Sequence, residues 1–136
     1  MVHLAELQGR QPKELYDFEE LRTKLNSGDR ISANDWERIS LASHSANEHA
    51  KLDAMDVMQE VRNTERRDEI LAVARVNLDS SNEFIQAKAL RLLWKSHSPD
   101  WKAVLSQKAT SPNETIRSVA TTCLNRGEFV RKEIKR

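Results

Sequence analysis

Three basic residues near the middle of the chain have a spacing that could hold phosphate groups. Lys88, Arg91 and Lys95 follow one another at i, i+3 and i+7, so in a helix they form one basic stripe. A basic stripe can neutralise the phosphates of a nucleic acid, and binding of that kind depends strongly on salt. Nucleic-acid binding on a basic concave face is therefore an alternative function for this chain.

An acidic stripe of the same spacing precedes the basic one. Asp53, Asp56 and Glu60 lie thirty-five positions before the three basic residues. If the two segments are neighbouring helices, the stripes can form ion pairs, and exposed pairs contribute roughly 0 to 1 kcal/mol each. We favour ion pairing between repeats over phosphate binding, with Asp79 as a further candidate for such pairs.

Trp94 stands beside the basic stripe and off the main apolar face of its helix. This is where an interface anchor is expected, although packing against the helix that contains Trp101 fits the pattern equally well. Trp94 and five basic residues of the C-terminal half form a set of candidate partner-binding residues. They are Lys88, Arg91, Trp94, Lys95, Arg117 and Arg126.

The residue pattern does not favour catalysis or metal binding. Glycines at positions 9, 28 and 127 are too scattered to build a phosphate-cradling loop. His44 and His49 are five residues apart on either side of a helix start, and His3 and His97 have no Cys, His or carboxylate at metal-ligand spacing. No serine stands in a Gly-flanked elbow. Cys123, the single cysteine, lies on an apolar helix face and is expected to be a packed thiol. We therefore expect no enzyme, no cofactor and no metal.

The basic stripe belongs to a pattern that occurs three times, in the frame S-x-N-E-x-[AI]-[KQR]-x-x-A-x-x-x-[LM]. The copies span 45–58, 80–93 and 111–124. Serine followed three residues later by glutamate is a capping box, which predicts Ser45, Ser80 and Ser111 as helix N-caps. Apolar residues then follow at i, i+4, i+7 and i+8, so each copy predicts one amphipathic helix. The alanine at the centre of each copy would let a neighbouring helix approach closely.

Composition extends this helical pattern to the whole chain. The 136 residues include only 3 Gly, 3 Pro and 1 Tyr, which favours helices over strands. A repeat period of 31 to 35 residues is typical of stacked helical units. We predict a single all-α domain over 1–136. Its segments are a lead-in over 1–11, an N-terminal helix over 12–27, helix pairs over 32–63, 64–96 and 98–126, and a cap or tail over 128–136.

The region from about 32 to 126 resembles HEAT repeats, whose second helix follows an acidic turn and carries a [VI]-R-x-x-A-x-x-x-L pattern. Ile116 and Arg117 begin the fullest version of this pattern, whereas the arginine position holds Lys51 and Gln86 in the other copies and only Asp79 fills the acidic turn. The resemblance implies a short right-handed α-α superhelix of about three HEAT-like helix pairs, with an extra N-terminal helix and a short C-terminal capping helix. It also implies one acid–arginine pair, between Asp79 and Arg117.

These features predict a non-catalytic α-solenoid that binds another protein. Residues 1–70 hold 10 Lys and Arg against 15 Asp and Glu, whereas residues 71–136 hold 12 against 6, and this polarity can orient a charged partner. In size, single-domain form and charge polarity the chain resembles small bacterial immunity proteins, which implies a toxin domain as the partner and toxin neutralisation as the function. Without a long apolar run or a disulfide framework, we expect a cytoplasmic protein that does not enter a membrane.

Overall fold

The computed structural model describes residues 18–61 and 65–129, and this part of the chain is helical with no strand. The predicted all-α class is confirmed for these residues. The lead-in 1–11, the start of the predicted N-terminal helix and the tail after Phe129 lie outside them. The helices are α3 (Glu19–Asn26), α4 (Ala33–Ser43), α5 (Glu48–Met58), α6 (Arg67–Asn77), α7 (Glu83–Lys95), α8 (Trp101–Lys108) and α9 (Glu114–Arg126).

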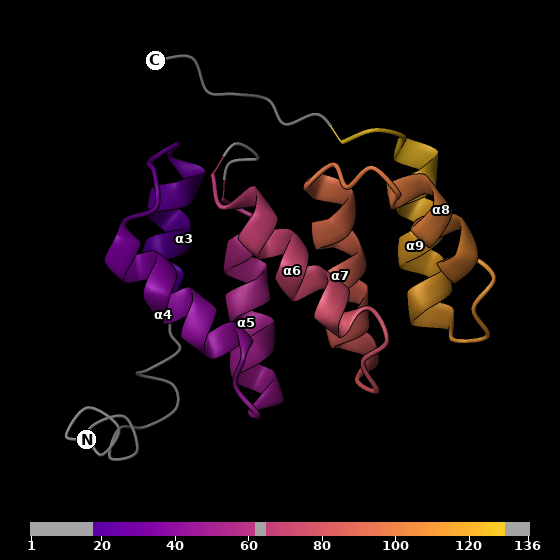
Figure 1. Ribbon diagram of the computed structural model, residues 1–136, viewed down its shortest axis with the longest axis horizontal. Coiled ribbons are helices and arrows are strands. Elements are labelled where there is room, and N and C mark those ends of the chain that lie inside the picture. Colours follow the sequence, from indigo (N-terminus) through magenta and orange to yellow (C-terminus); the bar gives the residue numbers. More distant parts are fainter. Residues whose placement is uncertain (1–17, 62–64, 130–136) are drawn as a thin grey trace.

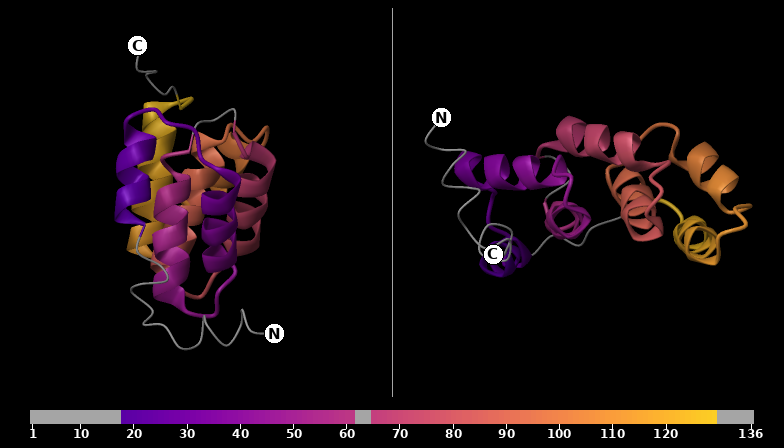
Figure 2. Two further views of the ribbon diagram at one scale, coloured as in Figure 1. Left: turned by 90° about the vertical axis from the view of Figure 1, so that its left-hand side faces the viewer. Right: turned by 90° about the horizontal axis from the view of Figure 1, so that it is seen from below.

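The helices form two rows. Seen from below, α4, α6 and α8 lie in one row and α3, α5, α7 and α9 in the other (Figure 2). Consecutive helices pack as pairs, α4 with α5, α6 with α7 and α8 with α9, and α7 also packs against both α5 and α9. The pairs follow one another along the long axis of the molecule (Figure 1). Each pair lies within one of the predicted ranges, so the helices of the three sequence copies, α5, α7 and α9, share one row.

The helices of the three copies begin two residues later than the capping-box pattern predicts. Their N-caps are Asn47, Asn82 and Asn113, and each Oδ1 accepts hydrogen bonds from first-turn N–H groups at 2.9 to 3.2 Å. Each predicted serine instead accepts a bond from the backbone N–H of the asparagine two residues later. The serine therefore shapes the turn before the helix, and the asparagine caps the helix.

The alanines at the centre of each copy are buried in the hydrophobic core. Ala54, Ala89 and Ala120 all have 0% of their surface exposed. Larger apolar side chains share the hydrophobic core with them. They include Met55, Met58, Ile85, Leu92, Leu93 and Ile116, each at most 1% exposed.

Polar contacts connect successive pairs, but not in the way the HEAT resemblance implies. The carboxylate of Asp79 accepts a hydrogen bond from Lys108 of α8 at 2.8 Å. Arg117 stands in the first turn of α9 and donates to the Ser111 carbonyl at 3.0 Å, so it bonds the loop before its own helix. The expected pairing of Asp79 with Arg117 is therefore wrong, because Asp79 is bonded to Lys108 and Arg117 is bonded to the carbonyl of Ser111.

Candidate partner-binding pocket

The first residue of the basic stripe, Lys88, forms an ion pair with Asp56 across the α5–α7 contact. Both side chains are less than one third exposed, at 24% and 29%. By the repeat offset Lys88 corresponds to Asp53, so the pair is displaced by about one helical turn from the register predicted. Asp53 contacts His49 of its own helix at 3.5 Å. At Lys88 the basic stripe therefore connects α7 to α5.

The last residue of the stripe, Lys95, is buried, with 6% of its surface exposed. Its Nζ donates to the carbonyl oxygen of Val61 at 2.9 Å and to that of Met58 at 3.4 Å. These carbonyls lie at and just after the C-terminal end of α5, where carbonyl groups lack partners within the helix and a positive charge is favourable. Lys95 therefore caps a neighbouring helix, and its ammonium group is occupied inside the protein.

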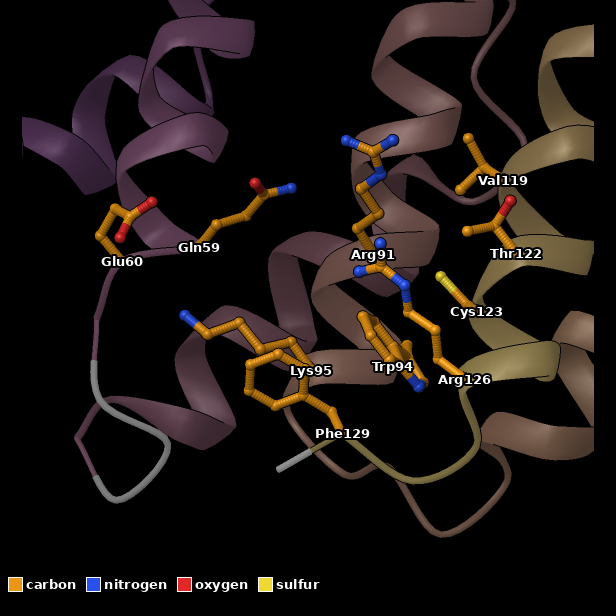
Figure 3. Close-up of a pocket in the computed structure, with 10 residues that line it drawn as sticks. All are labelled: Gln59, Glu60, Arg91, Trp94, Lys95, Val119, Thr122, Cys123, Arg126 and Phe129. Atoms are coloured by element: carbon orange, nitrogen blue, oxygen red, sulfur yellow. The ribbon is translucent and has the colours of Figure 1, made fainter. Parts of the chain in front are cut away.

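Arg91, the middle residue of the stripe, lies at a pocket between the C-terminal end of α5 and the helices α7 and α9 (Figure 3). The pocket has a volume of about 450 Å³, within the range of ligand sites in proteins. It is lined by Gln59, Glu60, Arg91, Trp94, Lys95, Val119, Thr122, Cys123, Arg126 and Phe129.

Two guanidinium groups at this pocket lack partners within the described part of the chain. Arg91 of α7 and Arg126 in the last turn of α9 are both exposed, and neither forms a hydrogen bond or ion pair with a described residue. Burial raises the pKa of the Cys123 thiol between them, and the charges of Arg91 and Arg126 oppose that rise. Both arginines therefore lie close enough to Cys123 to influence its thiol.

The wall beside the arginines is aromatic. Trp94 is 9% exposed, and its Nε1 donates to the carbonyl oxygen of Gly127 at 2.7 Å. The ring of Phe129 meets the indole edge to face, with centroids 5.0 Å apart. The sequence left packing and exposure of Trp94 equally open, and the structure buries most of this side chain while keeping it in the pocket wall.

A short segment after α9 brings Phe129 to that wall. Gly127 ends the helix with φ of 73°, a value that favours glycine and turns the chain back over α7. Glu128 then lies 3.3 Å from Nδ1 of His97. These contacts, with the bond from Trp94, tie the end of the described chain to the end of α7.

The α5 side of the pocket supplies two polar residues. The Nε2 atom of Gln59 is buried and has no hydrogen-bond partner among the described residues. Glu60 is the acidic residue of the lining, and with Arg91, Lys95 and Arg126 the formal charge of the lining is +2. The pocket is therefore rich in donors and positive in charge.

The structure brings together four of the candidate partner-binding residues, Arg91, Trp94, Lys95 and Arg126, while Lys88 and Arg117 lie outside the lining. Sequence reasoning missed Val119, Thr122 and Cys123 as lining residues. These three and Arg126 are spaced i, i+3, i+4 and i+7, which marks a single helix face. That spacing is the signal by which they could have been found.

Comparisons with known proteins identify no relative, because no family model, curated protein or solved structure matches the chain. Within residues 18–61 and 65–129, no group of three His, Cys, Asp or Glu side chains is placed to hold a metal ion. None of the described helices has the length and apolar character needed to cross a lipid bilayer.

Proposed function

We propose that this chain is a non-catalytic α-solenoid that binds another protein through the row of α5, α7 and α9. The observation that carries the proposal is the pair of exposed guanidinium groups, Arg91 and Arg126, beside an aromatic-walled pocket. Arginine and aromatic side chains are the residues enriched where proteins bind one another most tightly. The neighbouring cations, Lys88 and Lys95, are engaged in holding helices together, which leaves these two arginines for a partner.

The chemistry of the pocket supports binding rather than catalysis. Cys123 is the most nucleophilic side chain of the lining, and burial raises the pKa of its thiol. A thiol with a raised pKa stays protonated near neutral pH, and the protonated form is a poor nucleophile.

Within this class we favour a toxin-neutralising inhibitor. Its support is the small size and the charge polarity of the chain, to which the structure adds a positive pocket lined mainly by residues of the basic half. A positive pocket complements an acidic surface on the partner and speeds encounter with it. A toxin gene beside the gene of this protein would support this form of the proposal, and a solitary gene in unrelated settings would argue against it.

Nucleic-acid binding is the second candidate, supported by the accessible Arg91 and Arg126 guanidinium groups. It has less support because Lys88 and Lys95 have partners inside the protein, which leaves few cations to follow a phosphate backbone. Binding to a random duplex at about 50 mM salt tests it, since affinity that falls steeply as salt rises is its signature.

Capture of partners from a lysate of the native host tests protein binding. The bait is compared with a variant that carries Arg91→Gln and Arg126→Gln, and with a matched control that carries Arg22→Gln and Arg30→Gln. The control removes two exposed arginines near the other end of the row. A protein retained by the wild type and the control but lost by the pocket variant supports the proposal. Identical capture by all three baits contradicts it.

A further inference from the structure

We propose that the pocket recognises an acidic segment of the partner protein, with one carboxylate held between Arg91 and Arg126 and a neighbouring apolar side chain packed against the aromatic wall. This inference rests on the proposed protein-binding function and specifies its ligand. Three properties of the pocket support it: its donors, its charge and its apolar wall.

The donors of the pocket lack an acceptor. Arg91 and Arg126 present planar guanidinium groups from two different helices, and among the described residues neither has a bonding partner. Gln59 adds a buried Nε2 that also lacks a hydrogen-bond partner in the described chain. A carboxylate offers two oxygens, and its geometry matches the fork of an arginine. The guanidinium groups of the pocket can therefore donate hydrogen bonds to a carboxylate.

The charge of the pocket favours a small anion over a long polyanion. The lining has a formal charge of +2, since Glu60 offsets one of its three cations. The charge of Lys95 is held by carbonyl groups inside the protein, and Lys88 is paired with Asp56. No continuous row of cations remains along α7 to follow a nucleic-acid backbone, so the side chain of an aspartate or glutamate fits better.

The apolar wall of the pocket favours a ligand with an apolar group next to that anion. Trp94 and Phe129 form an edge-to-face pair, and Val119 and Cys123 of α9 lie in the same lining. A volume of about 450 Å³ accommodates side chains of a short segment. The recognised sequence therefore contains an acidic residue close to an apolar or aromatic one.

Selection of short random peptides displayed on phage tests the inference directly. Peptides selected on the wild-type protein should be enriched in Asp or Glu near an apolar residue. Binding of an enriched peptide should weaken about tenfold or more in the Arg91→Gln, Arg126→Gln variant, because charge-assisted hydrogen bonds are lost. The Arg22→Gln, Arg30→Gln control should bind as the wild type does. A variant with Arg91→Lys and Arg126→Lys keeps the charge without the planar fork and should recover only part of the affinity.

The outcomes separate this inference from the function on which it rests. Enriched peptides that lack acidic residues, or that bind the glutamine variant equally well, overturn the carboxylate inference while leaving protein binding in place. Selection that enriches no peptide also overturns it. If the captured host protein does not depend on the arginines, or if a nucleic acid is the ligand, the proposed function itself fails. Thermal unfolding of each variant confirms that the exposed substitutions leave the fold intact.

Discussion

The Nζ atom of Lys95 in α7 lies 2.9 Å from the carbonyl oxygen of Val61, just beyond the C-terminal end of α5. This bond places a cation at the negative end of a helix in the preceding pair. The side chain is buried, so water cannot replace the ammonium group at little cost. Lys95 therefore connects the two pairs at the base of the pocket.

Replacing Lys95 by methionine should destabilise the protein by about 2 kcal/mol, because the carbonyl oxygens of Met58 and Val61 lose a charged donor. Denaturation by urea measures the loss. Lys24→Met is the matched control, since the Lys24 side chain is 56% exposed and its Nζ lies as far as 3.9 Å from Oε1 of Glu20. This substitution should cost less than about 0.5 kcal/mol. Equal effects of the two substitutions would show that the buried bonds of Lys95 add nothing to stability.

The capping residues give a second prediction, in which the structure and the capping-box pattern disagree. Asn82→Ala removes the side chain that accepts bonds from Phe84 and Ile85, and it should cost about 1 kcal/mol. Ser80→Ala removes one bond before the helix and should cost less. Thermal denaturation of the two variants ranks them, and a larger loss for Ser80→Ala would restore the serine as the effective cap.

The parts of the fold that the sequence predicts are those set by local spacing. The three copies with Ala54, Ala89 and Ala120 predict the helices and the side that each buries, because one turn of helix is enough to define a face. The S-x-N-E motif predicts a helix start but not which residue caps it. Serine and asparagine can both accept first-turn bonds, and only the backbone geometry of the turn decides between them.

The pocket could be predicted only in part, because it depends on where three helices end. In the sequence, Lys88, Arg91 and Lys95 are three cations on one helix face, and nothing in their spacing distinguishes a buried one from an exposed one. The end of α5 at Met58 places carbonyl groups beside the buried Lys95, while Arg91 stays exposed. The turn at Gly127 brings Phe129 to the pocket wall, where its ring contacts Trp94 of α7. Phe129 and Trp94 are far apart in the sequence.

Close packing at the repeat alanines can be tested by overfilling one of them. Ala89→Leu adds bulk at a position with 0% exposure and should cost about 1 to 3 kcal/mol. Ala103→Leu makes the same change on the exposed side of α8 and should change the unfolding free energy by less than about 0.5 kcal/mol. If Ala89→Leu unfolds at the same temperature as Ala103→Leu, then the core around Ala89 is not closely packed.

Acid stability should depend on Asp100. Hydrogen bonds from Arg75 and then Ser98 lower the pKa of its carboxyl from 3.8 to about 2. A folded-state pKa below the unfolded value means that the stabilisation is present above pH 3.8 and is lost as the pH falls towards 2. Because the side chain is 46% exposed, the effect should stay below about 1 kcal/mol.

Urea midpoints measured across this acid range check that dependence. Asp100→Asn should remove the part of the pH dependence that belongs to this carboxyl, whereas Glu37→Gln, on the exposed side of α4, should leave it unchanged. Wild type and Asp100→Asn curves that remain parallel from neutral pH to pH 2 would contradict the assignment.

The final prediction separates the structural and binding parts of the basic stripe. Lys88→Glu places two carboxylates together at the partly buried contact with Asp56 and should cost about 1 kcal/mol or more. Adding Asp56→Lys restores opposite charges and should recover much of that loss. Arg91→Glu, three residues away and without an ion-pair partner in the described chain, should leave the unfolding temperature nearly unchanged and abolish partner binding. If the Lys88→Glu variant were as stable as the wild type, the structural role of Lys88 would be wrong. If the Arg91→Glu variant bound the partner normally, the binding role of Arg91 would be wrong.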